Sequence, residues 1–380
     1  MKKSRKKRTR ITISGYYGFG SIGDEAVLRS ILSGLSGKLS GAHVTVLTKS
    51  KKSLPDMQEI TLSALKRYDI ISLIFCLLRS KLFISGGGSL LQDHTSKRSL
   101  AYYTSLITLA KLCGCKIYIF ANGIGPIENT KKCKKALSVA DVISLRDPDS
   151  YSFAKMLLPE KEEIYLTADP VFSPYNTIRP SPFLSCLYGI GDKPYFAVSV
   201  RKCCGDKNID CEKLLSCIMY ARSLGYVPVF VSMQDSFDLE LSKRLAKKAG
   251  GIVADARNEK DLCRLLDGAS FAIGMRLHFL LFAIMRSLPV IPLSYDLKVE
   301  SCLRYMGISD FADAFDFSPE EINVMIQKAH CKKNSTDKIK QRISHLSALA
   351  RNDIHRAFAL TLGSEKETMK EIKPMEEVSG

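Results

Sequence analysis

Four side chains in the second half of the sequence could together hold a phosphorylated, anionic molecule. Arg201 ends the apolar run FAVSVR, Arg276 and His278 open an apolar segment, and Lys298 follows the run VIPLS. Arginine binds carboxylate and phosphate groups through two parallel hydrogen bonds, and lysine adds a point charge. Histidine changes charge near neutral pH, so His278 is a candidate general acid. The alternative is a histidine packed in the core.

Three glycine-rich turns follow apolar runs in the first half of the sequence: GYYGFGSIGDEAVL (15–28), LFISGGGSLLQD (82–93) and ANGIGPI (121–127). Glycine adopts positive φ readily and lets a ligand approach the backbone closely. The spacing in the first turn matches neither GxGxxG nor a P-loop. We therefore expect these turns to hold a bulky polar ligand such as a sugar, with candidate contacts at Gly18, Gly20, Gly87 and Gly88.

Three carboxylates beside these turns could orient or deprotonate a sugar hydroxyl. Asp24 and Glu25 enter the helix predicted after the first turn, and Asp93 follows the second turn. The alternative is structural, because acidic side chains also stabilise the positive end of a helix. Asp93 could equally be a surface residue. The choice among the three carboxylates stays open at this stage.

Arg146 is the remaining candidate cation. It ends the apolar run of VISLRDPDS and is expected to point to the same edge as the glycine-rich turns. The alternative is a structural ion pair with Asp147 or Asp149. Asp169 follows shortly afterwards in LTADPVF, where we expect the chain to leave its first domain.

The elements that position these residues alternate between short apolar runs and helical patterns. Uniformly apolar runs are typical of parallel strands covered on both faces, and strand–helix alternation predicts a doubly wound α/β fold. In such folds ligands bind at the carboxyl ends of the strands. The predicted strands are 10–14, 43–48, 82–85, 116–121, 142–145, 165–167, 195–200, 227–232, 251–254, 271–273 and 290–294.

The length of 380 residues suggests two or three domains. The Pro- and Gly-rich stretch 176–194 predicts a linker between two Rossmann-like domains that face a cleft. We expect a basic tail at residues 1–10, an acceptor domain at 11–178 and a donor domain at 179–334. A long C-terminal helix at 335–363 is expected to pack back, and a polar tail follows at 364–380.

The net charge is +17, and the first ten residues contain seven basic side chains and no acid. Such a tail is either solvated or attracted to an anionic membrane surface, where each basic residue contributes ~1 kcal/mol. No apolar stretch follows it, so it does not resemble a signal peptide. No nucleic-acid partner is expected, because the tail lacks aromatic residues and the sequence has no Trp.

Twelve cysteines are scattered without any CxxC pair, which is typical of reduced thiols in a cytosolic protein. A zinc cluster at Cys203, Cys204, Cys211 and Cys217 lacks the usual ligand spacing, so no metal and no other cofactor is expected. The apolar segment Ile70–Leu78 is too short to span a bilayer and is predicted to be a buried helix.

As a set, these motifs resemble the polysaccharide pyruvyl transferase family, and within it the CsaB type of bacterial cell-wall polymer biosynthesis. The resemblance covers about residues 11 to 310 and rests on GYYGFGSIGDEAVL, FISGGGSLLQD, ANGIGPI, SLRDPDS, TADPVF and GMRLHFLLFAIMRSLPVIPLSYDLKV. It implies a GT-B fold, phosphoenolpyruvate as the donor and a pyruvate ketal as the product. The implied acceptor is N-acetylmannosamine in a lipid-linked precursor of the undecaprenyl diphosphate type. S-layer homology domains recognise that modification.

By motif match, the family's phosphoenolpyruvate-binding and catalytic positions fall on Arg146, His278 and Lys298, with Arg276 and Arg201 as neighbours. The resemblance implies a cytoplasmic enzyme, peripheral on the inner face of the cell membrane. The alternative is a GT-B glycosyltransferase that uses a nucleotide sugar. Such an enzyme needs a carboxylate for the ribose hydroxyls, whereas the second half offers Arg276, His278 and Lys298 at its strand-to-helix turns.

Overall fold

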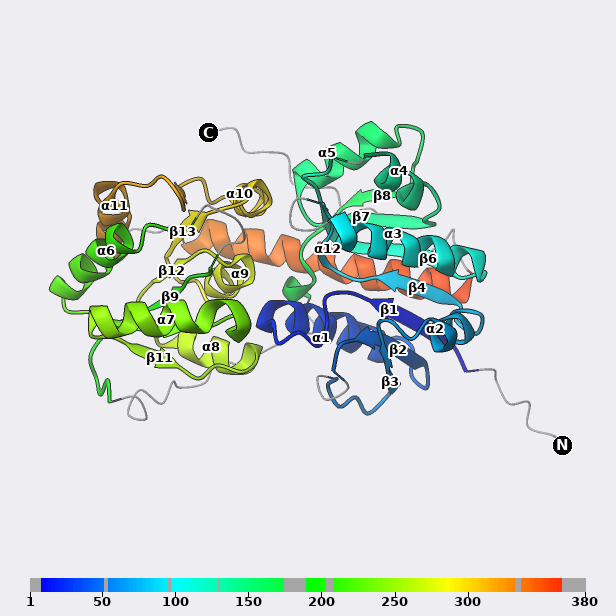
Figure 1. The fold of residues 1–380 in the computed structure, drawn as a ribbon, viewed down its shortest axis with the longest axis horizontal. Helices are drawn as coiled ribbons and strands as arrows, with labels where there is room; N and C mark the ends of the chain where they lie inside the picture. Colours follow the sequence, from blue (N-terminus) through cyan, green and yellow to red (C-terminus); the bar gives the residue numbers. More distant parts are fainter. Residues whose placement is uncertain are drawn as a thin grey trace. The chain divides into compact units, whose positions relative to one another are not determined.

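The computed structural model describes residues 8–50, 54–93, 97–128, 130–173, 189–202, 208–331 and 336–363. The chain divides into two compact units (Figure 1). Unit 1 comprises Met1–Phe19, Asp24–Thr177 and His345–Gly380, and unit 2 comprises Gly20–Gly23 and Ile178–Ser344. Most of the predicted linker 176–194 lies outside the described residues.

Unit 1 is built on an eight-stranded sheet whose described pairs are all parallel. The strand order is β3-β2-β1-β4-β6-β7-β8, and β5 also pairs with β6. Because the order reverses beside β1, connecting helices cover both faces of the sheet. The strands are β1 (Arg10–Ser14), β2 (His43–Thr48), β3 (Thr61–Lys66), β4 (Leu82–Ser85), β5 (Gly88–Leu91), β6 (Lys116–Ile124), β7 (Val142–Leu145) and β8 (Ile164–Leu166).

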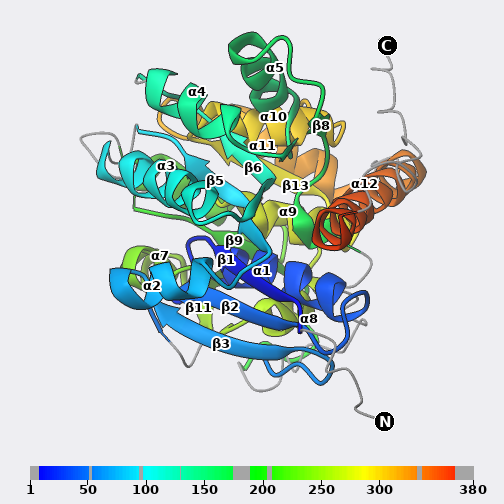
Figure 2. The ribbon, with the colours of Figure 1, turned by 90° about the vertical axis from the view of Figure 1, so that its right-hand side faces the viewer.

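One face of this sheet packs against α2, α3, α4 and α5, whose buried apolar side chains form a single core cluster with the strands. Figure 2 shows α2 and α3 on this side and α12 on the other. On the α12 side, Tyr118 of β6 donates a hydrogen bond to Asp353 at 2.8 Å. The helices that lie wholly or mostly in unit 1 are α1 (Ile22–Ser36), α2 (Ile70–Leu77), α3 (Lys97–Leu112), α4 (Thr130–Ser138), α5 (Pro148–Leu157) and α12 (Thr336–Leu362).

Unit 2 repeats the design with a six-stranded sheet in the order β11-β10-β9-β12-β13-β14, again with parallel pairs. Its strands are β9 (Tyr195–Ser199), β10 (Val227–Val231), β11 (Ile252–Ala254), β12 (Ala272–Gly274), β13 (Val290–Ser294) and β14 (Ala312–Asp313). Its helices are α6 (Cys211–Ser223), α7 (Asp235–Ala249), α8 (Glu259–Asp267), α9 (Leu277–Met285), α10 (Leu297–Tyr305) and α11 (Pro319–His330).

The local sequence explains where several helices begin and end. Asp147 precedes Pro148 and accepts a hydrogen bond from the Ser150 N–H, so α5 starts with a capping residue followed by proline. Asn258 caps α8 by accepting the N–H groups of Lys260 and Asp261. Gly250 ends α7 in a left-handed conformation that glycine adopts without strain.

The predicted doubly wound α/β fold is confirmed, and most predicted strands match the observed ones within a residue or two. The predicted burial of Ile70–Leu78 is wrong. This segment forms α2, but only Leu73 and Leu77 of that helix are buried. A helix that lies on a sheet contacts it along one stripe, so a helix that is apolar on all sides leaves its outer side uncovered.

Candidate active site

The predicted cations of unit 2 lie at one edge of its sheet. Strands β9, β12 and β13 are parallel neighbours, so their carboxyl ends meet at the same edge. Arg201 follows β9, Arg276 and His278 follow β12, and Lys298 follows β13. This edge therefore gathers three arginine or lysine residues and one histidine from turns distant in the sequence.

Arg276 is held by a carboxylate that the sequence did not indicate. Its Nε and Nη2 donate hydrogen bonds of 3.0 and 2.6 Å to the two oxygens of Asp238, on α7. Asp238 also accepts the N–H of Gln234 at 3.0 Å. Burial raises the pKa of Asp238, and the Arg276 guanidinium opposes that rise. Arg276 is therefore fixed at the N-cap of α9, with part of its charge already balanced.

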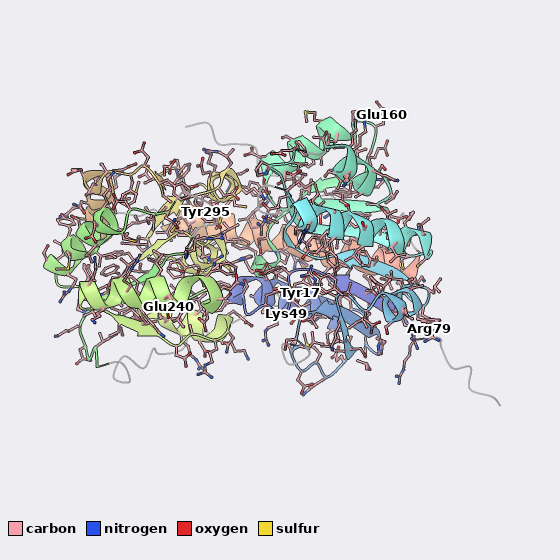
Figure 3. All side chains as sticks on the ribbon, viewed as in Figure 1. Tyr17, Lys49, Arg79, Glu160, Glu240 and Tyr295 are labelled. Carbon is pink, nitrogen blue, oxygen red and sulfur yellow. The ribbon has the colours of Figure 1, made fainter. Side chains whose placement is uncertain are left out.

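Arg201 is positioned by Tyr295, which follows β13. The guanidinium carbon lies 4.7 Å from the centroid of the tyrosine ring, and Nη1 donates to the ring hydroxyl at 2.9 Å. Stacking on an aromatic face retains the positive charge while it restricts the guanidinium plane. Figure 3 labels Tyr295 in unit 2.

His278 lies in the first turn of α9, against the glycine-rich turn at residues 20–23, which belongs to unit 2. In this turn Ser21 forms a bridge with Gln234, and the Ile22 N–H donates to the Met233 carbonyl at 2.9 Å. A Cβ on Gly23 would come within 2.2 Å of His278 Nδ1. Gly23 thus leaves the space that the imidazole ring occupies.

Lys298 is buried in the first turn of α10, where Asp296 accepts its backbone N–H at 3.0 Å. Two serines at the same sheet edge add buried hydroxyls. Ser199 ends β9 and Ser232 follows β10, and neither hydroxyl has a hydrogen-bond partner among the described residues. A buried polar atom without a partner costs about 1–3 kcal/mol, so these hydroxyls favour a ligand at this edge.

In unit 1, Arg146 follows β7 and forms a buried ion pair with Asp169, with 2.6 Å between Nη1 and Oδ2. Its Nη2 donates to Ser89 at 3.0 Å, in the second glycine-rich turn. The ion pair that sequence analysis left open at Asp147 or Asp149 therefore includes Asp169 instead, while Asp147 caps α5.

The three candidate carboxylates have different surroundings in unit 1. Glu25 accepts the N–H of Gly18 at 2.6 Å, so it holds the first glycine-rich turn. Asp93 accepts the N–H of Glu128 at 3.0 and 3.1 Å and ties two loops together. Asp24 lies at the edge itself, where a Cβ on Gly88 would be 3.4 Å from its Oδ1. Asp24 and Glu25 therefore each lie beside a candidate acceptor contact, Gly88 and Gly18 respectively.

The glycines of unit 1 meet two different needs. Gly18 has φ +78°, and a Cβ there would come within 2.2 Å of Thr48 Oγ1, so a larger residue would displace the turn. A Cβ on Gly87 would come within 2.9 Å of Val27 and 3.0 Å of Pro170. Gly20 has φ +73° but open space around its Cβ position. Gly18 and Gly87 are therefore required by packing, independently of any ligand.

A group of aromatic rings and cations that sequence analysis missed lies beside the first glycine-rich turn. Tyr16 stacks on Phe19 with ring centroids 4.2 Å apart, and the Lys49 ammonium lies 5.1 Å from the Phe19 ring. The Arg67 guanidinium lies over three rings, those of Phe19, Tyr102 and Tyr103. We call this the aromatic–cation cluster: Tyr16, Phe19, Lys49, Arg67, Tyr102 and Tyr103 (Figure 3 labels Lys49). The aromatic residues of the motif YYGF (16–19) are the feature of the sequence that could have indicated this cluster.

The described residues contain no group of three or more His, Cys, Asp or Glu side chains arranged to hold a metal ion. Cys203 and Cys204 of the rejected zinc cluster lie outside the described residues. No helix in the described part of the chain is long and apolar enough to cross a membrane.

The fold is that of GT-B enzymes. A UDP-N-acetylglucosamine 2-epimerase structure matches with TM-score 0.68 at 12% identity, over 97% of this chain and 100% of that one. Staphylococcus aureus MnaA with UDP matches with TM-score 0.63 at 10% identity, over 96% and 100%. A Siraitia grosvenorii UGT transferase with UDP matches with TM-score 0.57 at 10% identity, over 93% and 100%. At these identities the likeness shows the fold alone.

No curated protein sequence matches this chain. The family model of the polysaccharide pyruvyl transferases, in contrast, matches residues 22–296. That range begins at Ile22, the first residue of α1, and ends at Asp296, which caps α10. It includes Arg146, Arg201, Arg276 and His278. The chain therefore belongs to the polysaccharide pyruvyl transferase family, a family of transferase enzymes.

Proposed function

We propose that this protein transfers the enolpyruvyl group of phosphoenolpyruvate to a sugar, forms a pyruvate ketal and releases phosphate. The observation that carries the proposal is the group of Arg201, Arg276, His278 and Lys298 at the carboxyl ends of β9, β12 and β13, in a chain of this family. Phosphoenolpyruvate carries a carboxylate and a phosphate, so its binding requires several cations, and arginine can contact either group through two hydrogen bonds.

In the proposed reaction, His278 is the general acid that protonates the methylene carbon of phosphoenolpyruvate. C2 then acquires oxocarbenium character, and a sugar hydroxyl attacks it and loses its proton. The C2–O bond to phosphate breaks, and a neighbouring hydroxyl of the same sugar closes the ketal and releases a second proton. The cations at this edge balance the negative charge of the departing phosphate.

Unit 1 supplies the proposed acceptor surface. Asp24 is the proposed base for the sugar hydroxyl, because its Oδ1 would lie 3.4 Å from a Cβ on Gly88, a candidate acceptor contact in the second glycine-rich turn. Burial raises the pKa of Tyr17 well above its usual value, and the negative charge of Asp24 raises it further. The Asp24 carboxylate therefore lies near the Tyr17 ring. The aromatic–cation cluster offers ring faces for a sugar and positive charge for a diphosphate.

The acceptor in this proposal is N-acetylmannosamine of an undecaprenyl diphosphate-linked cell-wall precursor, as in the CsaB type, whose product anchors S-layer proteins. The enzyme would work in the cytoplasm, at the inner face of a bacterial membrane. The basic tail at residues 1–10 supports this location, because it would be attracted to anionic lipid. The reaction needs no metal or other cofactor, and no nucleic acid takes part.

The test combines phosphate release from phosphoenolpyruvate with mass spectrometry of a synthetic lipid diphosphate that carries N-acetylmannosamine. We expect acceptor-dependent phosphate release and a gain equal to one pyruvic acid less one water on the sugar. Phosphate release without ketal formation, or no reaction with any sugar acceptor, would contradict the proposal.

The alternative function is that of a glycosyltransferase that uses a nucleotide sugar. Only the fold that this chain shares with its structural neighbours favours this alternative. Glu300 on α10 is a carboxylate near the donor edge, but it accepts the Ser294 hydroxyl at 3.1 Å and pairs with Arg304 at 2.7 Å. Transfer of a sugar from a UDP-sugar to the same acceptor, without a requirement for phosphoenolpyruvate, would favour this alternative.

A further inference from the structure

Helix α2 carries a row of exposed apolar side chains along its outer side. Ile71, Ile74, Phe75 and Leu78 are spaced i, i+3, i+4 and i+7, so they share one face, and we call them the outer face of α2. Their exposed fractions are 72%, 37%, 58% and 59%. A row of four large apolar residues at these exposures is a feature that soluble domains rarely leave uncovered without a partner.

The opposite side of α2 already accounts for the packing of the helix. Leu73 and Leu77 are buried in the core of unit 1. The carbonyl of Leu77 accepts the thiol of Cys115 at 3.3 Å, and Thr12 of β1 lies 3.2 Å from the sulfur of Cys76. These contacts anchor α2 to the sheet. The fold therefore does not require the outer face to be apolar.

Positive charge lies directly beside this apolar row. Arg79 and Lys81 follow α2, and the Lys81 N–H donates to the carbonyl of Arg10 at 2.8 Å, which brings a third exposed cation to the same end. Figure 3 labels Arg79 at the periphery of unit 1. Over residues 66–81 the sequence has four basic residues and one acid, and the last residue of the basic tail, Arg10, is the first residue of β1.

We propose that the outer face of α2 inserts into the interfacial region of an anionic lipid bilayer. An apolar helix face beside basic residues matches a layer of acyl chains beneath negatively charged headgroups. A second copy of the chain would instead bring the same positive charges of two molecules together. The lipid surface is therefore the occupant that the charge pattern favours.

The segment just before α2 contacts the aromatic–cation cluster within unit 1. Tyr68, just before α2, contacts Tyr102 with ring centroids 5.8 Å apart, and Tyr102 lies under the Arg67 guanidinium at 4.4 Å. An acceptor attached to a membrane lipid would then meet the cluster beside the inserted helix. This last step rests on the proposed function, whereas membrane binding itself does not.

The first test measures binding of the full chain to vesicles of phosphatidylcholine with phosphatidylglycerol, in the absence of substrates. The double variant Ile71→Ser with Phe75→Ser should lower the partition coefficient between water and vesicles about tenfold or more. The reason is that two apolar side chains, which move from water into the bilayer in the wild type, are missing. Met156→Ser with Val324→Ser is the matched control, since both residues are exposed on other helices, and it should bind as the wild type does. Circular dichroism and thermal unfolding confirm that each variant is folded.

A third variant separates α2 from the basic tail: Lys2→Gln, Lys3→Gln and Lys6→Gln. In this background the α2 substitutions should still lower binding by a similar factor. Equal binding of the α2 variant and the wild type to anionic vesicles would overturn the proposal. So would a wild-type dimer in analytical ultracentrifugation that the α2 variant loses, because the face would then cover a second copy.

The second test uses the absence of tryptophan from this sequence. Phe75→Trp places a single indole on the outer face of α2, and Met156→Trp places one on α5 as the control. On addition of anionic vesicles, emission of the Phe75→Trp protein should shift to shorter wavelength and be quenched by brominated lipids. Emission of the control should change little. An unquenched indole at position 75 on bound protein would show that α2 does not insert.

Discussion

Arg146 and Asp169 form an ion pair inside unit 1, with 2.6 Å between Nη1 and Oδ2 and only 4% and 3% of their side chains exposed. Asp169 also accepts the Val171 N–H at 3.2 Å, so one carboxylate joins the end of β7 to the turn Pro170–Phe172. A buried guanidinium is stable here because its charge is paired. The arrangement can serve the fold, the donor or both, and substitutions separate these roles.

Loss of one partner of this pair should destabilise unit 1. Asp169→Ala leaves a buried cation and should lower the free energy of unfolding by about 3 kcal/mol, measured by urea denaturation. Arg146→Met with Asp169→Asn removes both charges and should recover part of the loss. If Arg146 also contacts phosphoenolpyruvate, the folded double variant stays inactive. Wild-type turnover by that variant would restrict Arg146 to a structural role.

The contact between Gly23 and His278 predicts a coupled effect on catalysis. His278→Ala should lower kcat about 10²- to 10⁴-fold if the imidazole is the general acid. Gly23→Ala places a methyl group where the ring lies, so it should also lower kcat. In the double variant the second substitution should add little, because both act through the same ring. Independent, additive losses in steady-state kinetics would contradict this coupling.

Glu25 and Asp24 should respond differently to amide substitution. Glu25→Gln keeps an oxygen that can accept the Gly18 N–H, so most activity should remain, whereas Glu25→Ala should raise the KM for the acceptor. Asp24→Asn should lower kcat about 10²-fold or more, because an amide cannot accept the proton of a sugar hydroxyl. If Glu25→Gln were as inactive as Asp24→Asn, Glu25 would become the better candidate for the base.

The aromatic–cation cluster should affect the acceptor and not the donor. Phe19→Ala removes the ring on which Tyr16 stacks and over which Lys49 and Arg67 lie. We expect the KM for the sugar acceptor to rise about tenfold, as for the loss of one stacked ring, while the KM for phosphoenolpyruvate stays unchanged. Equal changes in both KM values would indicate a general loss of structure, which thermal unfolding would detect.

Asp141 should contribute to stability in a pH-dependent manner. Burial tends to raise its pKa, but the Ile117 N–H and the ammonium groups of Lys111 and Lys116 outweigh burial and lower the pKa below its usual value of 3.8. The folded state therefore favours the ionised form, which stabilises the protein above pH ~4 and loses its effect as the pH falls through the lowered pKa. Asp141→Asn should thus be less stable than the wild type at pH 7.

The difference between Asp141→Asn and the wild type should shrink as the pH is lowered through this range. Thermal unfolding from pH 7 down to pH 3 measures it. Asp192→Asn, at an exposed position, is the control and should show no such trend. A difference that stays constant over the whole pH range would show that the carboxylate charge is not what stabilises this site.

Much of the architecture could be predicted because it depends on local patterns. The apolar runs at β1, β2 and β7 matched the observed strands, since each of these runs is almost wholly buried between helices. The edge strand β3 was missed, because its side chains are only half-buried and its sequence TLSALK lacks a continuous apolar run. The outer face of α2 was predicted to be buried, because an apolar segment does not itself show how many layers will cover it.

The sequence by itself determined the doubly wound α/β class, the glycine-rich turns and the position of Arg201, Arg276, His278 and Lys298 after strands. Only the tertiary structure decided which side chains meet: Arg146 with Asp169, 23 residues apart, and Arg276 with Asp238, 38 residues apart. It also decided that Glu25 and Asp93 hold loops while Asp24 lies beside Gly88. The physical reason is that periodicity and backbone preference act over a few neighbours, whereas these partners come from separate strand-to-helix connections that only the packed sheet brings into contact.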